Sequence, residues 1–490
     1  MTSSLDDALQ VLLDPALEPI VELVALRRDG AYEAHAVDGM VRFERDEGGA
    51  LRTLAVEGRD PLGDGATDRF SPLADEVANR HPHRTINAYP YAREQIAQVY
   101  DHASPPDLVV LHTAAHHWAE QGGHIGEHGS MGVVQARAPF VIAGRGVRAG
   151  GMVDRHARLV DVAPTVAALM GVAPLDDAGT YLAGQDGTAM ADLLDPTEHP
   201  DHVVGFLLDG TNPNVLYDVA AHGGAPNIAR LMAMGTSFAH GVFSSLPTVT
   251  LANHTTALTG RHPGRHGILH NAWWDRAERR QVITNDAANW ATAMKFLTPG
   301  TETLHDAVRR TWPDAFTVSI NEPADAGARY STFDLMRRGV RMDFPRTPDG
   351  LPHSTERFVR PFKDYGWYTQ VDHHGLQQAL GVLGGSYLGD DYPLPRFCWF
   401  NLTLTDSAFH EGGPHSDIAR ASIVDTDGRI GEVLALLEAL GIFDRCAFYL
   451  VADHGMEESN PDVRGDWDAA LTEAGIDFRD EAYGFVYLNP

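Results

Sequence analysis

The stretch Cys446-Ala447-Phe448-Tyr449-Leu450-Val451-Ala452-Asp453-His454-Gly455-Met456 decides the fold, because a near-continuous apolar run ends in an acidic residue and a histidine. Such a run predicts a strand of a parallel sheet that helices cover on both faces. Two more runs repeat the pattern, since residues 203–208 precede Asp209 and residues 396–404 lead into Asp406. Open α/β sheets bind ligands at the carboxyl ends of their strands, so we expect these carboxylates to contribute to one site.

The composition is that of a soluble globular protein. An apolar share of 43% is ordinary for this class, and 490 residues suffice for a large core or for two to three domains. The net charge of −29 argues against binding polymeric nucleic acid over a broad basic face. Phosphorylated substrates are compatible with this charge, because bound metal ions can supply the local positive charge.

The cysteines and the first residues indicate a cytoplasmic protein. Cys398 and Cys446 each lie in an apolar run, which is typical of buried structural thiols rather than of a disulfide framework. The first residues carry Asp6 and Asp7 and no basic region, unlike a signal peptide. No run is long and apolar enough to span a bilayer. We therefore expect a cytoplasmic enzyme without a membrane partner.

The expected elements divide the chain into residues 1–195 and 203–490, joined by a connector at 196–202. Residues near 330–390 are polar and aromatic and contain proline, which predicts an inserted cap. Residues 6–24 show apolar residues at helical spacing that two prolines interrupt. Strands are expected within 26–59 and at 107–111, 138–144, 203–208, 396–404, 445–451 and 484–488, and helices at 159–170, 226–234 and 250–259.

Thr250 is the candidate nucleophile, at the start of a helix that ends at Gly260. A free threonine hydroxyl is a poor nucleophile, and metal coordination is one of the few ways to activate it. The N-terminus of a helix also favours phosphate, through its free N–H groups and its dipole. Thr248 lies two residues earlier and is an equally plausible capping residue.

Two further motifs follow the Thr250 helix, namely Asp406-x-x-x-His410 and the Asp453-His454-Gly455-Met456 sequence. In this order they resemble the alkaline phosphatase superfamily, and most closely its type I phosphodiesterase/nucleotide pyrophosphatase branch. The resemblance implies two divalent metal ions, most simply zinc, with manganese or iron as alternatives that His and Asp ligands also accept. One ion would be held by Asp209, Thr250, Asp453 and His454, and the other by Asp406, His410 and His128.

The resemblance also assigns roles around the nucleophile. The family spacing of three from nucleophile to asparagine selects Thr250 and makes Asn253 the donor to a non-bridging phosphoryl oxygen. His254 is interpreted as a packing or capping residue. The chain departs from the family pattern at Phe409, where glycine usually precedes the histidine. Asp427 matches a recurrent family position and is interpreted as structural.

His128 stands on the wrong side of the other motifs. The family places a Gly-x-His-Gly motif after Asp-His-Gly-Met, whereas here Gly126-Glu127-His128-Gly129 lies near the other end of the chain. The apolar run 138–144 and the segment 161–165 follow His128 in the family's order. We therefore expect a circular permutation, in which 203–490 forms the N-terminal part of the catalytic domain and 1–195 its C-terminal part. Residues 484–488 would then share a sheet with 108–111.

Two other histidine patterns have weaker interpretations. His124-Ile125-Gly126-Glu127-His128 spells the motif of inverted zinc peptidases, but its glycines disfavour the helix that this motif requires. The cluster of His112, His116 and His117 near a strand end is interpreted as a set of rim residues that face the substrate.

Together these observations predict an α/β fold of alkaline phosphatase type, with a mostly parallel central sheet, helices on both faces and an inserted cap. The expected reaction is metal-dependent hydrolysis of a phosphodiester or phosphoanhydride through a phospho-threonine, on a small phosphorylated substrate such as a nucleotide. A phosphomonoesterase or phosphonate hydrolase would use the same site. A non-catalytic, metal-stabilised binding protein is the alternative from another class. The sequence leaves the substrate and the oligomeric state open.

Overall fold

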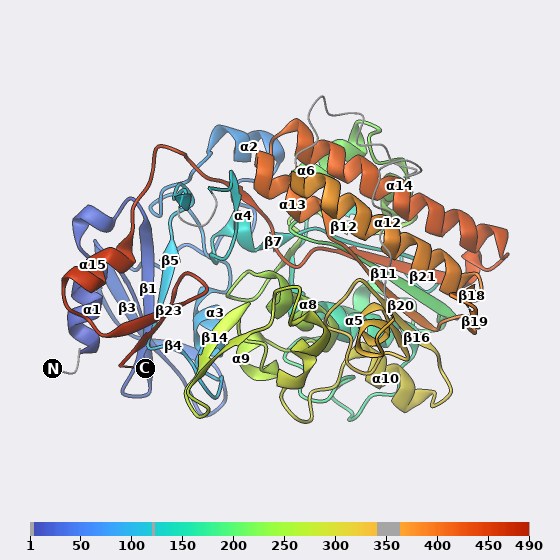
Figure 1. The fold of residues 1–490 in the computed structure, drawn as a ribbon, viewed down its shortest axis with the longest axis horizontal. Helices are drawn as coiled ribbons and strands as arrows, with labels where there is room; N and C mark the ends of the chain where they lie inside the picture. Colours follow the sequence, from blue (N-terminus) through green and yellow to red (C-terminus); the bar gives the residue numbers. More distant parts are fainter. Residues whose placement is uncertain (1–3, 120–122, 341–362, 490) are drawn as a thin grey trace.

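The computed structural model describes residues 4–119, 123–340 and 363–489 and shows two large sheets side by side (Figure 1). The main sheet has eight strands in the order β17-β16-β20-β11-β21-β8-β12-β9. Its central neighbours β16, β20, β11 and β21 run parallel, and β8 runs antiparallel to β21 and β12. The strands are β8 (Phe140–Gly144), β9 (Gly151–Val153), β11 (His202–Leu208), β12 (Gly235–Phe238), β16 (Thr317–Ile320), β17 (Tyr330–Ser331), β20 (Phe397–Leu402) and β21 (Cys446–Val451).

Helices cover both faces of the main sheet, which explains why its central strands β11 and β21 are almost entirely apolar. Val203 and Leu207 of β11 pack on one side, and Val204, Phe206 and Leu208 pack on the other. Successive side chains of a strand point to opposite faces, so a strand covered twice needs apolar residues at every position. One layer holds α5 (Val162–Met170), α8 (Thr250–Thr259) and α10 (Leu304–Thr311), and the other holds α6 (Pro213–Ala221), α7 (Pro226–Met234), α12 (Lys363–Leu383) and α14 (Asp417–Ala439). The predicted α/β class with a mostly parallel sheet is confirmed.

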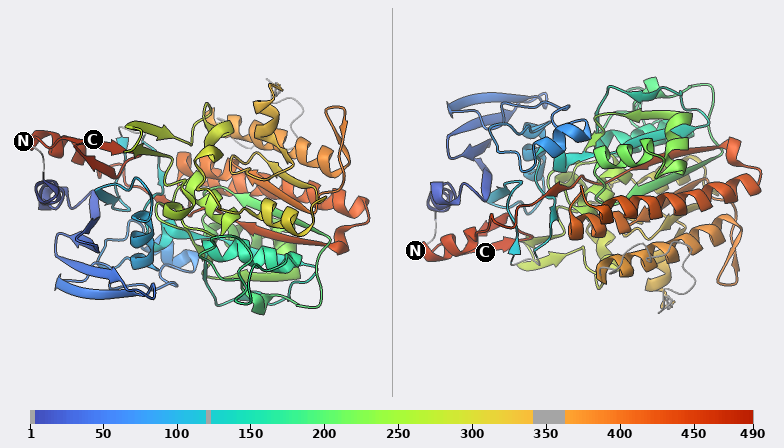
Figure 2. Two further views of the ribbon diagram at one scale, coloured as in Figure 1. Left: turned by 90° about the horizontal axis from the view of Figure 1, so that it is seen from below. Right: turned by 90° about the horizontal axis from the view of Figure 1, so that it is seen from above.

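The second sheet is antiparallel and lies at one end of the molecule, where both chain ends are found (Figures 1 and 2). Its order is β23-β24-β5-β1-β2-β3-β4. Its strands are β1 (Val21–Arg28), β2 (Ala31–Ala36), β3 (Gly39–Arg45), β4 (Leu51–Gly58), β5 (Leu108–His112), β23 (Phe478–Glu481) and β24 (Phe485–Leu488). The helical pattern expected over 6–24 forms a helix only in its first part, because the two prolines separate this short helix from β1.

The two halves of the chain share both sheets. β24 pairs with β5, with Val486 opposite Leu108, so the predicted pairing of 484–488 with 108–111 is confirmed. In the main sheet, β8 and β9 of the first half flank β12 and β8 also pairs with β21, both strands of the second half. Each of the two large sheets is therefore completed by strands from the other half of the chain.

The expected cap is only partly visible, since 341–362 lie outside the described residues. Helix α12 follows this segment and differs from a projecting cap, because Leu376 and Val382 belong to the core under the main sheet.

No helix in the described ranges has the length and apolar character needed to cross a membrane. The remaining elements are α1 (Leu5–Leu12), α2 (Leu73–Ala78), α3 (Ala92–Val99), α4 (Val133–Ala136), α9 (Pro263–His266), α11 (Thr332–Arg337), α13 (Leu404–Gly412), α15 (Trp467–Glu473), β6 (Gly126–Glu127), β7 (Arg137–Ala138), β10 (Ala157–Arg158), β13 (Val242–Phe243), β14 (Ala272–Asp275), β15 (Arg280–Ile283), β18 (Ser386–Tyr387), β19 (Asp390–Asp391) and β22 (Glu457–Glu458).

Two acidic residues are buried where the sheets meet. Glu22 of β1 accepts hydrogen bonds from Asn87 Nδ2 at 3.2 Å and from the Tyr89 hydroxyl. Glu457 of β22 accepts one from Gln135 Nε2 at 3.2 Å. Burial raises the pKa of Glu22 to about 7 and that of Glu457 to about 8, where the neighbouring Glu22 adds to the increase. Both carboxyl groups are therefore stabilised in the protonated form by folding.

We predict that the metal-free protein loses stability as the pH rises through neutrality. Each pKa lies above the ordinary value of 4.5, so the folded state binds more protons than the unfolded state and this contribution disappears at high pH. Each group contributes up to about 1.4 kcal/mol per pH unit between its two pKa values. Urea denaturation at several pH values gives the free energy of unfolding as a function of pH. This free energy should fall less steeply with pH for Glu22→Gln and for Glu457→Gln than for the wild type. Equal slopes would contradict this account.

Candidate metal centre

The three predicted carboxylates follow three adjacent strands. Asp209 comes directly after β11, and Asp453 follows β21 by one intervening residue. Asp406 lies in the first turn of α13, which begins shortly after β20. Gly210 leaves room for this approach, because a Cβ atom there would lie 2.4 Å from Asp406 Oδ1 and its φ is +62°. Parallel pairing therefore gathers the three side chains at one edge of the sheet.

The predicted ligands form overlapping groups. In each group, the candidate ligand atoms all lie within 4.8 Å of one another. The first group is His128, Asp406 and His410, which is the complete set expected for one ion. The other two groups at the strand ends are Asp209 with Asp406 and His454, and Asp209 with His254 and Asp453. All six predicted histidine and aspartate ligands thus lie in this cluster.

Each predicted histidine ligand uses Nδ1 for a backbone hydrogen bond and leaves Nε2 for the cluster. The Nδ1 atoms of His128, His410 and His454 lie 2.8, 2.7 and 2.9 Å from the carbonyl oxygens of Thr248, Gly126 and Gly455, respectively. A carbonyl oxygen only accepts, so Nδ1 carries the proton and donates. Nε2 then keeps its lone pair for a metal, which is the usual arrangement around a ligating histidine.

Several buried polar atoms of the cluster have no hydrogen-bond partner among the described residues. They are Asp209 Oδ1, Asp406 Oδ1, Asp453 Oδ2, His254 Nε2 and His454 Nε2. Burying so many polar atoms without well-directed hydrogen bonds would be costly unless protons or a bound cation offset their charge. Carboxylate oxygens and imidazole nitrogens are ligands that zinc, manganese and iron accept. The donor set therefore fits divalent metal ions.

Without a metal, protons hold the cluster together. Burial and the neighbouring Asp453 and Asp406 raise the pKa of Asp209 well above its ordinary value. Burial also opposes ionisation of Asp453, but His454 and His254 outweigh it and bring its pKa well below the usual range. Burial lowers the pKa of His454, yet Asp453 more than compensates and raises it to about 9. Metal binding must displace such protons, so affinity rises with pH.

His128 reaches the cluster on a segment that is tied to the other half of the chain. Ile125 N donates to His410 O at 2.9 Å, and β6 pairs with β22 next to the Asp453 loop. Gly129 N donates to Thr248 Oγ1 at 2.9 Å. A Cβ atom on Gly126 would lie 2.2 Å from Phe409 O, so this approach requires glycine. The segment before His128 therefore packs closely against the backbone at position 409, although Phe409 stands there in place of the glycine of the family pattern.

The two threonines before and at the start of α8 have different environments. Thr248 is fully buried, and its hydroxyl donates to Ser130 O at 2.7 Å while it accepts from Gly129 N. Thr250 is half-buried and lines a cavity together with Asp209 and Asp406. The geometry therefore favours Thr250 as the nucleophile and gives Thr248 a structural role.

Asn253 does not face the site, which corrects its predicted role. It is fully buried, and its Nδ2 donates to the carbonyl oxygens of Ser245 and Pro247 at 3.0 and 2.8 Å. Its Oδ1 accepts from Ser245 N at 2.8 Å. These bonds brace the loop that leads into α8 and leave no free amide hydrogen for a substrate.

His254 was expected to pack or cap, but it lies inside the cluster. Its Nε2 is 3.5 Å from Asp209 Oδ2 and 3.4 Å from Asp453 Oδ2. Its Nδ1 is 2.9 Å from Glu322 Oε2, and Trp399 Nε1 donates to the same carboxylate at 3.1 Å. The sequence contained a signal for this position, because residues 250 and 254 are one helical turn apart and share a face.

Asp427 has the structural role that was expected. Its Oδ1 accepts a hydrogen bond from Ile228 N in the first turn of α7 at 2.7 Å.

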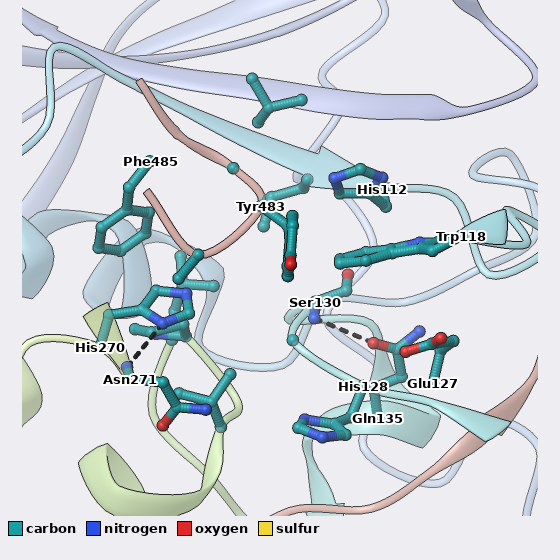
Figure 3. Close-up of a pocket in the computed structure, with 18 of the residues that line it drawn as sticks. His112, Trp118, Glu127, His128, Ser130, Gln135, His270, Asn271, Tyr483 and Phe485 are labelled. Atoms are coloured by element: carbon teal, nitrogen blue, oxygen red, sulfur yellow. Dashed lines mark hydrogen bonds between the residues drawn. The ribbon is translucent and has the colours of Figure 1, made fainter. Parts of the chain in front are cut away.

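Two cavities open next to the ligand cluster. The first, of about 300 Å³, is lined by His128 and His410 and by Asn271, whose buried Oδ1 has no partner among the described residues (Figure 3). The second, of about 710 Å³, is lined by Thr250 and Asp209 and by mostly apolar and aromatic side chains. Of the histidines expected at the rim, His112 lines the first cavity, while His116 and His117 are buried beside it. Asn271 belongs to no pattern that the sequence singled out.

Comparison with known proteins identifies the class. The type I phosphodiesterase / nucleotide pyrophosphatase family matches residues 203–490, more than half of the chain. The chain therefore belongs to this family, which places it in the alkaline phosphatase superfamily. Members of the family are enzymes that use divalent metals, in agreement with the ligand groups described above. The match does not include His128, which the structure brings to the site from outside the matched range.

Individual relatives cover less of the chain. Ectonucleotide pyrophosphatase/phosphodiesterase family member 1 of Rattus norvegicus is 25% identical over 256 residues, which is 52% of this chain and 24% of that protein. Alkaline phosphatase PafA of Elizabethkingia meningoseptica is 31% identical over 96 residues, or 20% of this chain and 18% of that protein. The match to the first relative thus spans about a quarter of its length.

Solved structures with partial similarity belong to the same two groups. Murine ectonucleotide pyrophosphatase/phosphodiesterase 5, an inactive form in complex with AMP, aligns with 15% identity and a TM-score of 0.36 over 54% of this chain and 59% of its own. Wild-type PafA aligns with 18% identity and a TM-score of 0.36 over 52% and 63% of the two chains.

We predict that His128→Ala weakens the binding of one metal ion while His124→Ala leaves the metal content nearly unchanged. His128 shares its group with Asp406 and His410, whereas His124 is half-exposed and belongs to a separate group with Glu127 and His410 at the edge of the cluster. The loss should be at least about tenfold in affinity, because even partners of ligating residues contribute that much. Metal content per chain after dialysis against graded chelator is the measurement. The opposite ranking would make His124 the ligand in place of His128, and unchanged metal content in both variants would mean that the first half of the chain does not complete the centre.

Proposed function

We propose that the protein hydrolyses phosphodiesters or phosphoanhydrides with two divalent metal ions, most simply zinc, through a phospho-Thr250 intermediate. The observation that carries this proposal is the set of unpartnered ligand atoms beside a half-buried threonine at a helix N-terminus. Membership of the type I phosphodiesterase / nucleotide pyrophosphatase family supports the reaction class. The family includes nucleotide pyrophosphatases by its description, which supports a small phosphorylated substrate such as a nucleotide.

The residues of the site have distinct roles in this reaction. When bound, the two metal ions supply Lewis acidity and lower the pKa of a hydroxyl group or a water molecule. Thr250 Oγ1 attacks phosphorus in line, the bond to the leaving oxygen breaks, and the leaving group departs on the opposite side. The free N–H groups at the start of α8 stabilise the negative phosphoryl oxygens. Water then cleaves the phospho-threonine and restores the Thr250 hydroxyl.

Asn271 takes the role that the sequence suggested for Asn253. Its side chain lines the cavity that also contains His128 and His410 (Figure 3). Its Oδ1 is buried and has no partner in the described part of the chain, so the amide is not committed there to holding the backbone. We assign its Nδ2 as a hydrogen-bond donor to a non-bridging phosphoryl oxygen.

We also propose that the chain is circularly permuted. The support is the sharing of both sheets by the two halves, together with a family match that begins at residue 203. In this arrangement 203–490 and then 1–195 would follow the order of the family, with 196–202 as the connector. The His128→Ala experiment tests this proposal, because it asks whether the first half completes the metal centre.

Two other functions would use the same residues. A phosphomonoesterase or phosphonate hydrolase differs only in what occupies the cavities beside the ions. A non-catalytic binding protein is disfavoured because the described residues retain a complete ligand set and the candidate nucleophile.

We predict that Thr250→Ala lowers kcat by about 10³ or more, because the covalent route is lost. Metal content should be largely retained, since the histidine and aspartate ligands remain. Thr250→Ser keeps a hydroxyl and should keep measurable activity, and Thr248→Ser is the matched control outside the cavity. Hydrolysis of bis(4-nitrophenyl) phosphate by the zinc-loaded protein is the assay. Full activity of Thr250→Ala would transfer the nucleophile to Thr248.

We predict opposite effects of the two asparagines. Asn271→Ala should lower kcat/KM by about 10²–10³, as expected for a lost donor to the transition state, without changing thermal stability. Asn253→Ala should destabilise the fold by about 1–3 kcal/mol, because it leaves buried backbone groups unpaired. Calorimetric unfolding and steady-state kinetics on both variants distinguish these roles. A stable but inactive Asn253→Ala protein would restore the original assignment.

A further inference from the structure

The smaller cavity has features that a phosphate site alone does not explain. It extends from His128 and His410 to the rings of Trp118 and Tyr483, which enter it from the side opposite Asn271 (Figure 3). Both halves of the chain build it, since its walls include residues of β5 and residues of the turn between β23 and β24. The described residues that line the larger cavity, in contrast, all lie between 209 and 406.

The position of the smaller cavity matches the leaving side of the proposed reaction. Thr250 lines the larger cavity, whereas His128 and His410 line the smaller one. In-line displacement places the attacking and leaving oxygens on opposite sides of phosphorus. The group that departs therefore points into the smaller cavity, and the group retained on phosphorus points into the larger one. This step rests on the proposed function.

The smaller cavity is poorly suited to a negatively charged leaving group. None of its described lining residues is arginine or lysine, and the sequence from 112 to 136 contains neither. Its lining includes the acidic side chain of Glu127, whose buried Oε1 accepts no hydrogen bond from a described residue. His270 is uncharged there, because burial lowers its pKa to about 3. A pyrophosphate or phosphate group in this cavity would therefore gain no ion pair from an arginine or lysine among its described lining residues.

Two arginines on segments next to β5 and to the turn between β23 and β24 are already engaged. Arg276 Nη2 donates to Asp107 at 2.6 Å, and Arg479 Nε donates to Glu481 at 2.9 Å while its guanidinium lies over the ring of Trp274. Their charges are therefore offset by carboxylates outside the cavity.

The aromatic wall is held in place by an unusual turn. Ala482 and Tyr483 both have positive φ, 51° and 61°, a conformation that non-glycine residues rarely adopt. Asp480 Oδ1 accepts from Gly484 N at 2.8 Å and fixes the turn. Strained residues of this kind persist where the surroundings hold them and are frequent at functional sites. Tyr483 remains 45% exposed, so its ring has a surface that a ligand can cover.

The rings around Tyr483 form one continuous surface. The centroids of Trp118 and Tyr483 lie 5.4 Å apart with an edge-to-face arrangement. Trp118 also packs against His112, with centroids 4.1 Å apart. Such a surface attracts planar or apolar groups through area burial and ring contacts.

We infer that this cavity receives the leaving alcohol of a phosphodiester, that this alcohol carries no negative charge, and that its planar or apolar part packs against Trp118 and Tyr483. The inference narrows the proposed reaction from diesters and anhydrides to diesters. It also assigns the departing substituent on phosphorus to the smaller cavity.

The kinetic test uses two substrates that leave the same thymidylate on the enzyme. Thymidine 5′-(4-nitrophenyl) phosphate releases an aryl alcohol, and thymidine 5′-triphosphate releases pyrophosphate. Trp118→Ala and Tyr483→Ala should each lower kcat/KM for the aryl ester by about tenfold and change it for the triphosphate by less than about twofold. Tyr483→Phe keeps the ring and should resemble the wild type with both substrates.

A binding measurement tests the cavity without catalysis. Saturation-transfer NMR of 4-nitrobenzyl alcohol with the metal-free protein should show contact with the aromatic ring of the ligand, which Trp118→Ala removes and Tyr483→Phe preserves. Added pyrophosphate should not displace the alcohol.

The two measurements separate two kinds of failure. If the protein hydrolyses neither substrate, the proposed function fails, and the NMR result alone decides what the cavity binds. If it hydrolyses both and the variants reduce triphosphate turnover at least as much as ester turnover, the inference is overturned while the proposed function stands. An NMR contact that persists in Trp118→Ala would also overturn it.

Discussion

Mutual repulsion among Asp209, Asp406 and Asp453 is the constraint on which the rest of the site depends. Their strands β20, β11 and β21 are neighbours in parallel register, so the sheet itself brings three carboxylates to one buried edge. A cluster of this kind is stable only if positive charge offsets it. The histidines that turn Nε2 inward, and the unpartnered atoms around them, are the arrangement that two divalent ions would complete.

The second constraint is the connection between His128 and the loop before α8. The carbonyl oxygen of Thr248 accepts from the His128 ring, and the Thr248 hydroxyl binds the two residues that follow His128. Thr250 lies two residues further on, so one short loop sets the positions of a candidate ligand and of the candidate nucleophile. A segment from the first half of the chain and a helix from the second are therefore held as one unit.

The sequence predicted what depends on local pattern. Apolar runs identified the central strands, and the acidic residues after them lie together because parallel strands end at a common edge. Asn253 could not be assigned from spacing alone, since spacing does not reveal that its amide is used by Ser245 and Pro247. Trp118 and Tyr483 meet only because β24 pairs with β5, a long-range pairing that no local periodicity encodes.

The order of the chain has a physical consequence for substrate recognition. The described residues that line the larger cavity all belong to 203–490, so in the proposed reaction that part of the chain would determine which group is retained on phosphorus. The smaller cavity is lined by residues of both halves. Substitutions in the turn at 482–484 or around Trp118 therefore alter the surroundings of the departing group and leave the larger cavity and the strand-end carboxylates in place. In a two-sided site of this kind, the preference for one leaving alcohol over another can change independently of the chemistry at the ions.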